Sequence, residues 1–355
     1  MINALELKNL TVFKEATFEF GKNLNVFVGE NGTGKSHLFK ILYATCRTLA
    51  DSKFSLDCKI NKFDLAERLE ANLLGTFAID SLEKLISIDA AQDASVSISD
   101  FSCKTFSYLM PNLAKDADHL APIEIKKDTL KSSSQALFIQ QDEILSHYDN
   151  FRSTLQKRAL DFDLTYRDLA DALNREPYTE EELKKVEKYY APLEKLIEPY
   201  VVKYEDGKFY FEATSKDAAK NKITQDAAMV AEGHRKIGML AYLIKNGSLG
   251  NNTIFFWDEP ETSLNPKLLR YLLSALVTLS EHMQIFIATH SLFLLREFEI
   301  LTEQKVLKDS RFFGLELSKD GLIVNQGNTA SEIGSVAALD ASLNQADRYL
   351  EVTED

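Results

Sequence analysis

The sequence predicts an α/β fold built around a parallel sheet. Three apolar, β-rich runs at residues 24–28, 253–257 and 284–289 are each followed directly by polar residues. A stretch without Gly or Pro, which favours a helix, follows the first run after a short loop. Buried parallel strands end at one edge of their sheet, where ligands bind in α/β folds. We therefore expect the polar residues after the three runs to meet at that edge.

The N-terminal region predicts an antiparallel β lobe beside this sheet. Residues 4–10 and 16–20 have the composition of strands. Residues 51–135 combine a predicted helix with two β-like runs and carry no recognisable motif; the three segments are 64–74, 95–99 and 105–110. We interpret them as further structure of the lobe.

Residues 145–200 predict a helical insertion. Thr179 and Glu182 have the spacing of a capping box. Apolar side chains then recur at 3,4,3,4 spacing, at Leu183, Val186, Tyr190, Leu193 and Ile197. Pro192 should kink or divide this helix. The insertion is either a surface that docks a partner or supports a dimer, or a buried helical hairpin.

Residues 301–355 predict a C-terminal α/β extension. The segment 312–324 reads as a hairpin around Asp320-Gly321, and the end of the chain is acidic and helical in character. We expect residues 1–355 to form a single composite domain that includes the insertion and this extension.

The composition is that of a soluble globular protein. The 355 residues include 41 Lys and Arg against 54 Asp and Glu, a formal net charge of −13, and 45% of them are apolar. The first residues lack the features of a signal peptide, and no apolar run approaches the ~20 residues of a membrane span. Three widely spaced cysteines indicate neither a disulfide framework nor a zinc site. We expect a cytoplasmic protein without a membrane partner; the acidic balance does not indicate nucleic acid, although it is compatible with a local basic patch.

A phosphate-binding loop follows the first apolar run. Residues 29–36 read GENGTGKS, which matches GxxxxGK[ST] in full between a predicted strand and a predicted helix. Backbone amides of such a loop and of the helix start surround phosphate oxygens. Lys35 should reach the β- and γ-phosphates, and Ser36 should supply a hydroxyl ligand to Mg²⁺. The predicted nucleotide-binding residues are Asn31, Gly32, Thr33, Gly34, Lys35, Ser36 and His37.

The second and third runs carry catalytic candidates. Asp258 and Glu259 end the second run, and strand alternation should point them to different sides. Asp258 is then placed to hold Mg²⁺, and Glu259 to polarise the attacking water. His290 closes the third run, and we expect it to sense the γ-phosphate. The predicted catalytic residues are thus Lys35, Glu259 and His290, and the predicted cofactors are ATP and Mg²⁺.

The segments GENGTGKS, WDEPETSLNP and IATHS resemble, in this order, the ATP-binding cassette (ABC) ATPases of the SMC, RecF and OLD group. The stretches FIQQDEILSHYDNF, VAEGHRKIGMLAYLIKNGSL and FFWDEPETSLNPKLL are similar to the stand-alone AAA family ATPases of Septu and PARIS anti-phage systems. The resemblance covers roughly residues 1–50 and 136–300. It implies a P-loop NTPase fold of ABC-ATPase type in which two subunits enclose two ATP molecules.

The resemblance also assigns loops. Residues 230–236 resemble the signature loop, with Gly233 facing the ATP of the other subunit, and a helix is predicted from Arg235 to about Lys245. Ala231 replaces the usual serine, and a plain helix start is the alternative. Asn265 belongs to the D-loop, residues 261–266. The Q-loop glutamine that helps to bind Mg²⁺ is Gln140 or Gln141, with Gln140 favoured, while Asp142-Glu143 reads equally as a helix start.

These observations support three hypotheses about function. The first is an ATPase switch, a homodimer or higher even-numbered oligomer, that controls a separate effector protein, expected to be a nuclease, in anti-phage defence. The extension after His290 is too short to hold the nuclease domain of OLD proteins, so any nuclease should be another chain. The second is a RecF-like or SMC-like DNA-binding repair ATPase. The third is a nucleotide-binding scaffold with little turnover. Phe13 and Lys14 are positional candidates for the adenine contact.

Overall fold

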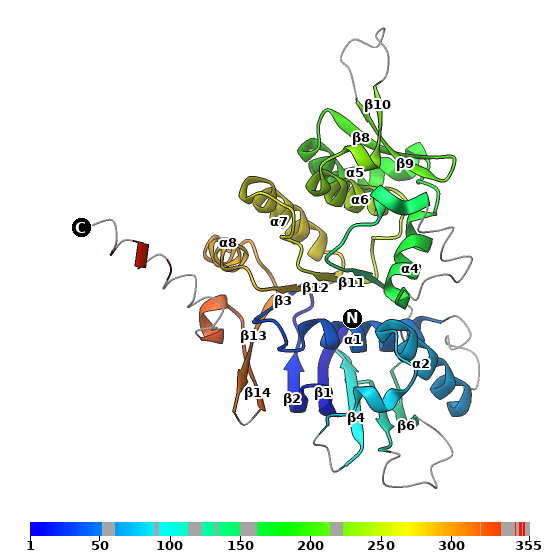
Figure 1. Cartoon of the computed structure of the whole chain (residues 1–355), viewed down its shortest axis with the longest axis vertical. Coiled ribbons are helices and arrows are strands. Elements are labelled where there is room, and N and C mark those ends of the chain that lie inside the picture. The colour runs from blue at the N-terminus through cyan, green and yellow to red at the C-terminus, as the bar shows by residue number, and fades with distance from the viewer. Residues whose placement is uncertain are drawn as a thin grey trace.

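A six-stranded sheet forms the centre of the protein (Figure 1). The computed structural model describes residues 1–51, 61–88, 92–112, 123–130, 132, 134–149, 162–213, 223–319, 321–334, 345, 348–349 and 351. The strand order is β14-β13-β3-β12-β11-β7, and only the edge strand β14 is antiparallel to its neighbour. The strands are β3 (Leu24–Gly29), β7 (Gln135–Ile139), β11 (Thr253–Asp258), β12 (Gln284–Thr289), β13 (Arg311–Ser318) and β14 (Gly321–Gly327). The predicted α/β class and its three motif-bearing parallel strands are confirmed.

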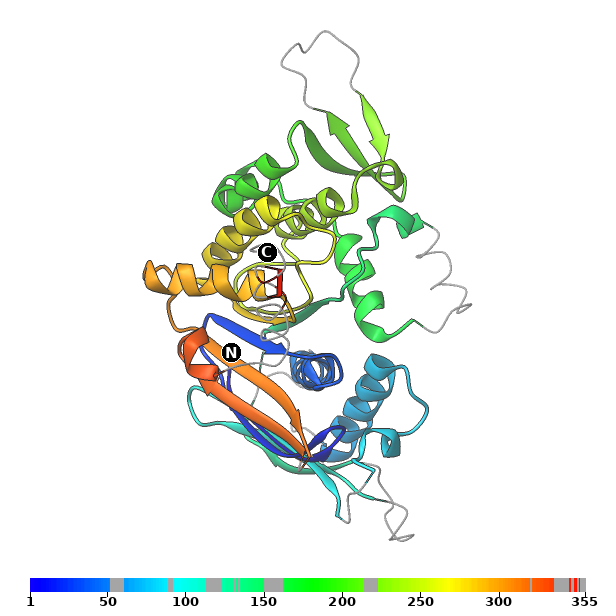
Figure 2. The same ribbon diagram turned by 60° about the vertical axis from the view of Figure 1, so that its left-hand side comes forward.

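Alternating side chains of this sheet build two cores. On β3, Val26 and Val28 face one core, while Phe27 faces the other. On β11, Trp257 belongs to the first core and Phe256 to the second. This period of two is what a strand buried on both faces requires. The sheet therefore lies between two layers, with α4 to α8 on one side and α1 on the other (Figures 1 and 2).

Four helices connect the motif-bearing strands or follow them. They are α1 (Lys35–Ala50), α6 (Glu232–Lys245), α7 (Pro266–Ser280) and α8 (Leu292–Glu303). Short 3-10 helices lie at Leu82–Leu85, Leu145–His147, Ala227–Met229 and Ala330–Ile333. Among the described helices, none combines the length and the apolar character that crossing a membrane requires.

The predicted antiparallel lobe is confirmed. It is a five-stranded sheet of order β2-β1-β4-β5-β6, and α2 accompanies it (Figure 1). The elements are β1 (Ile2–Leu10), β2 (Phe13–Glu19), α2 (Lys62–Phe77), β4 (Ala94–Asp100), β5 (Thr105–Met110) and β6 (Glu124–Asp128). The side chain of Asn61 caps α2 by accepting a hydrogen bond from the amide of Phe63. The helix expected at 64–74 and the strands expected at 95–99 and 105–110 are all present.

The helical insertion packs on the main core. It contains α4 (Leu164–Leu173) and α5 (Glu180–Leu196), and the predicted capping box of Thr179 and Glu182 is formed. Of the two outcomes expected at Pro192, a divided helix is wrong, because α5 continues past this residue, while a kink stays a prediction. Leu193 and Ile197 are fully buried and attach this last turn to the core.

A three-stranded sheet follows the insertion and was not predicted. Its order is β10-β9-β8, with β8 (Tyr200–Glu205), β9 (Lys208–Ala213) and β10 (Thr224–Asp226). The C-terminal hairpin is present as β13 and β14, which extend the central sheet. The predicted acidic helical end lies largely outside the described residues.

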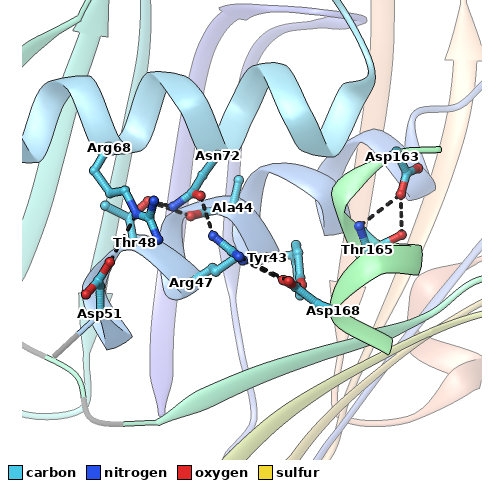
Figure 3. Close-up of polar contacts among 10 residues, drawn as sticks. All are labelled: Tyr43, Ala44, Arg47, Thr48, Asp51, Arg68, Asn72, Asp163, Thr165 and Asp168. Carbon is cyan, nitrogen blue, oxygen red and sulfur yellow. Dashed lines mark hydrogen bonds and ion pairs between the residues drawn. The ribbon is translucent and has the colours of Figure 1, made fainter. Parts of the chain in front are cut away.

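A polar junction joins α4 to α1 and α2 (Figure 3). We use this name for Tyr43, Arg47, Asn72 and Asp168. The Asp168 carboxylate accepts hydrogen bonds from the hydroxyl of Tyr43 and from Nε and Nη2 of Arg47, the last at 3.0 Å. Arg47 Nη1 also donates to Oδ1 of Asn72 at 2.5 Å. The insertion is therefore attached to the helix that follows the phosphate-binding loop.

Candidate nucleotide-binding site

The loop between β3 and α1 has the backbone shape of a phosphate cradle. Gly32 and Gly34 have φ angles of 84° and 87°, in the left-handed region that favours glycine. A Cβ at Gly34 would lie 2.6 Å from Cγ2 of Val12, whereas a Cβ at Gly32 would have no atom within 4 Å. The loop is thus packed against the lobe at Gly34 and open at Gly32. Its open side is free to receive an anion.

Lys35 lies in the first turn of α1 and is buried. Its Nζ donates to the carbonyl oxygens of Gly29 at 2.7 Å and Glu30 at 2.9 Å. Burial lowers the pKa of Lys35, and the negative charges of Asp258 and Glu259 oppose this effect. Among the described residues no carboxylate forms an ion pair with Lys35. Its charge is therefore available for a phosphate.

Ser36 and Asp258 are brought together although they are 222 positions apart in the sequence. The Ser36 hydroxyl donates a hydrogen bond to Oδ2 of Asp258. Burial raises the pKa of Asp258, and the hydrogen bond from Ser36 acts in the opposite direction. A hydroxyl and a carboxylate oxygen side by side fit Mg²⁺, which takes oxygen ligands.

Glu259 turns out of the strand and meets His290. β11 ends at Asp258, and Glu259 has a φ of 49° while its amide donates to the Ala288 carbonyl at 2.8 Å. Glu259 itself therefore has the left-handed conformation and lies just outside the strand. The two carboxylates contact different partners, Ser36 for Asp258 and His290 for Glu259. Oε1 of Glu259 lies 2.9 Å from Nδ1 of His290. The His290 side chain is 50% exposed and the Glu259 side chain 18%, so the pair lies at the surface of the site.

Glu261 and Thr289, for which the sequence predicted no separate role, contact each other beside His290. The Thr289 hydroxyl donates to Oε1 of Glu261, and Thr289 Oγ1 accepts from the Ser291 amide at 3.0 Å. Oε2 of Glu261 is buried, and no described residue forms a hydrogen bond with it. Burial raises the pKa of Glu261. The two contacts hold the residues on both sides of His290, and the only signal in the sequence was a second glutamate two residues after Glu259.

The signature segment packs against the D-loop of its own chain. α6 begins at Glu232, three residues before the helix start that was predicted at Arg235. Ala231 is its N-cap residue and forms no side-chain capping bond. A Cβ at Gly233 would lie 2.7 Å from the Ser263 carbonyl oxygen. Nζ of the fully buried Lys236 donates to the Thr262 carbonyl at 2.9 Å. Gly233 is thus required for close packing within one chain, and its contact with the ATP of another subunit stays a prediction.

Gln140 and Asn265 make contacts within the chain. Nε2 of Gln140 donates to Oδ2 of Asp163 at 2.7 Å, an oxygen that also accepts from Nζ of Lys40 at 2.8 Å. Its role toward Mg²⁺ stays a prediction. Oδ1 of Asn265 caps α7 by accepting from the Leu268 amide at 3.0 Å.

The carboxylate of Glu143 confirms the alternative of a helix start. It accepts from the amides of Leu145 and Ser146 at the beginning of a 3-10 helix, at 2.7 and 3.3 Å. It also forms an ion pair with Nε of Arg235 on α6 at 2.5 Å. The segment after Gln140 is thus linked to the signature helix.

The remaining predicted residues surround the loop. Thr33 Oγ1 donates to the Glu30 carbonyl at 2.8 Å, and Asn31 is exposed. Burial lowers the pKa of His37, whose ring lies 5.5 Å from that of Phe77. Phe13 is fully buried in the lobe core, so its ring is not free to stack on an adenine base.

Solved structures show the class of this fold. The Smc head domain of Pyrococcus furiosus, solved with an extended coiled coil and bound to the C-terminal domain of ScpA, has 13% identity and a TM-score of 0.52 and covers 100% of this chain and 99% of its own. A SmcHead bound to the C-winged helix domain of ScpA has 13% identity and a TM-score of 0.54 and covers 92% and 97%. An SMC head domain from Thermotoga maritima has 12% identity and a TM-score of 0.48 and covers 91% and 97%. The likeness to the first two structures shows that this chain has the fold of an Smc head domain.

The family follows from the sequence match. Residues 115–296, more than half of the chain, match the family model described as "AAA domain, putative AbiEii toxin, Type IV TA system". The protein therefore belongs to this AAA-domain family. No curated protein matches it.

Proposed function

We propose that this protein binds and hydrolyses ATP as the switch subunit of a dimer that controls a separate effector protein. One observation carries the proposal: Lys35, the Ser36–Asp258 pair and the Glu259–His290 pair all lie at the carboxyl edge of the same parallel sheet. Ligands collect at this edge in α/β folds, and these side chains have the chemistry that phosphoryl transfer to water requires. We also propose that residues 1–355 form a single domain, which includes the helical insertion at residues 145–200 and the C-terminal extension at residues 301–355.

Each residue has a role in this proposal. Lys35 and the amides at the start of α1 bind the phosphates. Ser36 and Asp258 hold Mg²⁺, with help from Gln140, and the ion neutralises charge on the phosphate oxygens when it is bound. Glu259 orients the attacking water and accepts its proton, and His290 fixes the Glu259 carboxylate and contacts the γ-phosphate. Glu261 is a positioning residue, because its bond to Thr289 supports the loop that carries His290.

The proposal also covers how two subunits associate and which partner they control. Gly233 and Asn265 of one subunit face the ATP of the other, so that ATP closes the dimer and hydrolysis opens it. The family description, which names a toxin of a toxin–antitoxin system, supports a role in defence. The Smc heads were solved with a bound ScpA domain, which supports the expectation of a protein partner here. We expect that partner to be the effector, a nuclease.

Two other functions have support from particular observations. The fold of Smc heads supports the DNA-binding repair ATPase. Ala231, which caps α6 without a side-chain hydrogen bond, supports the scaffold with little turnover. Both keep the same ATP site, so they differ from the first proposal in turnover and in the partner that is bound.

Phosphate release by the wild type and by Glu259→Gln tests the central claim. Glu259→Gln keeps the shape of the side chain and removes the base, so release should fall by about 10²–10³-fold. ATP binding should persist, measured by quenching or enhancement of Trp257, the single Trp of the chain. If the wild type with Mg·ATP releases phosphate no faster than the variant, hydrolysis is refuted and the scaffold is the better function.

A further inference from the structure

A groove of about 740 Å³ lies between α5 and α7. The two helices lie side by side in both views (Figures 1 and 2). Its walls are positions 188, 189, 192, 195 and 196 of α5 and positions 267, 268, 271, 274, 275 and 278 of α7. These spacings place each set on one face of its helix. From Lys267 to Thr278 the groove follows α7 for roughly three turns, the length of a short helix.

The chemistry of the groove differs from that of the whole protein. Much of the groove lining is hydrocarbon, contributed by Pro192, Leu196, Leu268 and Ala275. The aromatic ring of Tyr271, which is 44% exposed, adds to the α7 wall. An apolar strip between two helices that leaves a large aromatic side chain in water is typical of a binding groove.

All full charges that line the groove are positive. They belong to Lys188, Lys195 and Lys267, and no Asp or Glu lines it. Within the described part of the chain, none of these three lysines forms an ion pair with a carboxylate. The sequence of α7 contains no acidic residue at all. In a chain with a net charge of −13, this is a local excess of positive charge.

We propose that this groove binds an acidic amphipathic helix of a partner protein. The apolar face of such a helix would cover the hydrocarbon strip, and its carboxylates would pair with the three lysines at the rims. A nucleic-acid backbone fits less well, because phosphates would leave the apolar strip uncovered and only three cations face it. Charge complementarity thus favours an acidic helix and disfavours a basic one.

The position of the groove links its occupant to the ATP site. One end is formed by His234, in the signature segment, and by Asn265, which caps α7 in the D-loop. A helix bound in the groove therefore contacts both segments that the proposed function assigns to the dimer interface. This part of the inference rests on the proposed function, and it identifies the groove as the place where the effector is attached.

Photo-crosslinking in the native cell tests the proposal on the full-length protein. The photoreactive amino acid p-benzoylphenylalanine replaces Tyr271, and mass spectrometry maps the peptide that is attached after irradiation. The expected product is a segment of another protein with apolar residues at 3,4 spacing and an excess of Asp and Glu. A crosslink to a second copy of this chain, to nucleic acid or to a segment without acidic residues overturns the proposal.

A charge-matched pair of variants supplies the control. Lys188→Glu/Lys195→Glu/Lys267→Glu should lower the crosslink yield at least about fivefold, because three attractions become repulsions. Lys104→Glu/Lys184→Glu/Lys319→Glu changes the net charge equally at exposed positions outside the groove lining and should leave the yield unchanged. Equal yields in the two triple variants also overturn the proposal.

A binding measurement separates this proposal from the proposed function. The crosslinked segment, synthesised as a fluorescent peptide, should bind the full-length protein at least about tenfold more tightly than it binds the groove triple variant. Phosphate release is measured on the same samples and should be equal in the two triple variants. If the wild type does not hydrolyse ATP but peptide binding depends on the three lysines, the groove proposal is supported and the ATPase switch is refuted. If the wild type hydrolyses ATP but peptide binding does not depend on the three lysines, the groove proposal is refuted and the ATPase switch is kept.

Discussion

The nucleotide edge and the polar junction both contact α1, and they are organised in opposite ways. At the polar junction, the carboxylate of Asp168 accepts donors from Arg47 and Tyr43, so its charge is compensated within the chain. At the nucleotide edge, burial lowers the pKa of Lys35 and raises that of Asp258. The first arrangement stabilises the fold. The second holds charges at a cost until a ligand arrives, which is typical of functional sites.

The largest difference between the two regions should appear in Lys35→Ala. Removal of this amine takes away the positive charge facing the phosphates, so phosphate release should fall by about 10²–10⁴-fold. The melting temperature without ligand should fall little, since among the described residues the amine bonds to two loop carbonyls and to no carboxylate. A phosphate-release assay measures the first effect. Calorimetry without ligand measures the second, and calorimetry with Mg·ATP reports binding, because a ligand that binds the native state raises its stability. A Lys35→Ala protein that is stabilised by Mg·ATP as strongly as the wild type would contradict the assigned site.

The polar junction should behave in the opposite way. Asp168→Ala leaves the guanidinium of Arg47 without its main partner in a partly buried position, and should lower the free energy of unfolding by about 2–4 kcal/mol. Urea unfolding followed by circular dichroism measures this change. The double variant Arg47→Met/Asp168→Leu should recover part of the loss, because no charge is left unpaired. A loss below about 0.5 kcal/mol for Asp168→Ala would show that the junction does not attach α4.

The nucleotide edge was largely predictable because its residues follow apolar strands. Lys35, Asp258 and His290 each stand directly after such a run or within a fixed motif, and parallel strands bring their ends together whatever lies between them. The same reasoning gave the capping box at Thr179, since that signal is local in the sequence.

The polar junction was not predictable, because Asp168 lies more than 100 positions from Tyr43 and Arg47 and the four residues belong to no motif. Arg47 and Asp168 are 121 residues apart, and each is an ordinary surface-type residue of its helix. The same limit applies to Pro192, where burial of Leu193 and Ile197 overrides the local tendency to break the helix. The start of α6 at Glu232 was also missed, because Ala231 carries no capping side chain that would mark it.

Glu261 supports the nucleotide edge through Thr289, so the loss of activity on its substitution should be smaller than that of Lys35→Ala. Glu261→Ala removes the acceptor for Thr289, so the loop that carries His290 loses one support. We expect phosphate release to fall by about tenfold through kcat, with little change in KM, because ATP itself is not contacted. Thr289→Val removes the same bond from the other side and should give a similar loss. If the double variant multiplies the two losses, the residues act independently and the positioning role is refuted.

The smallest expected effect is a gain in stability from Asp258→Asn in the absence of ligand. Burial raises the pKa of Asp258 above its ordinary value of 3.8, so the ionised form is disfavoured in the folded state and native stability is lost as the pH rises through that raised pKa. Asparagine does not titrate and keeps an acceptor for Ser36. The melting temperature of the variant should therefore exceed that of the wild type by roughly 2–4 °C at pH 8, a difference that disappears below about pH 4. A variant that melts below the wild type at pH 8 would mean that the Ser36–Asp258 pair stabilises the empty fold as the polar junction does, and the contrast between the two regions would then be lost.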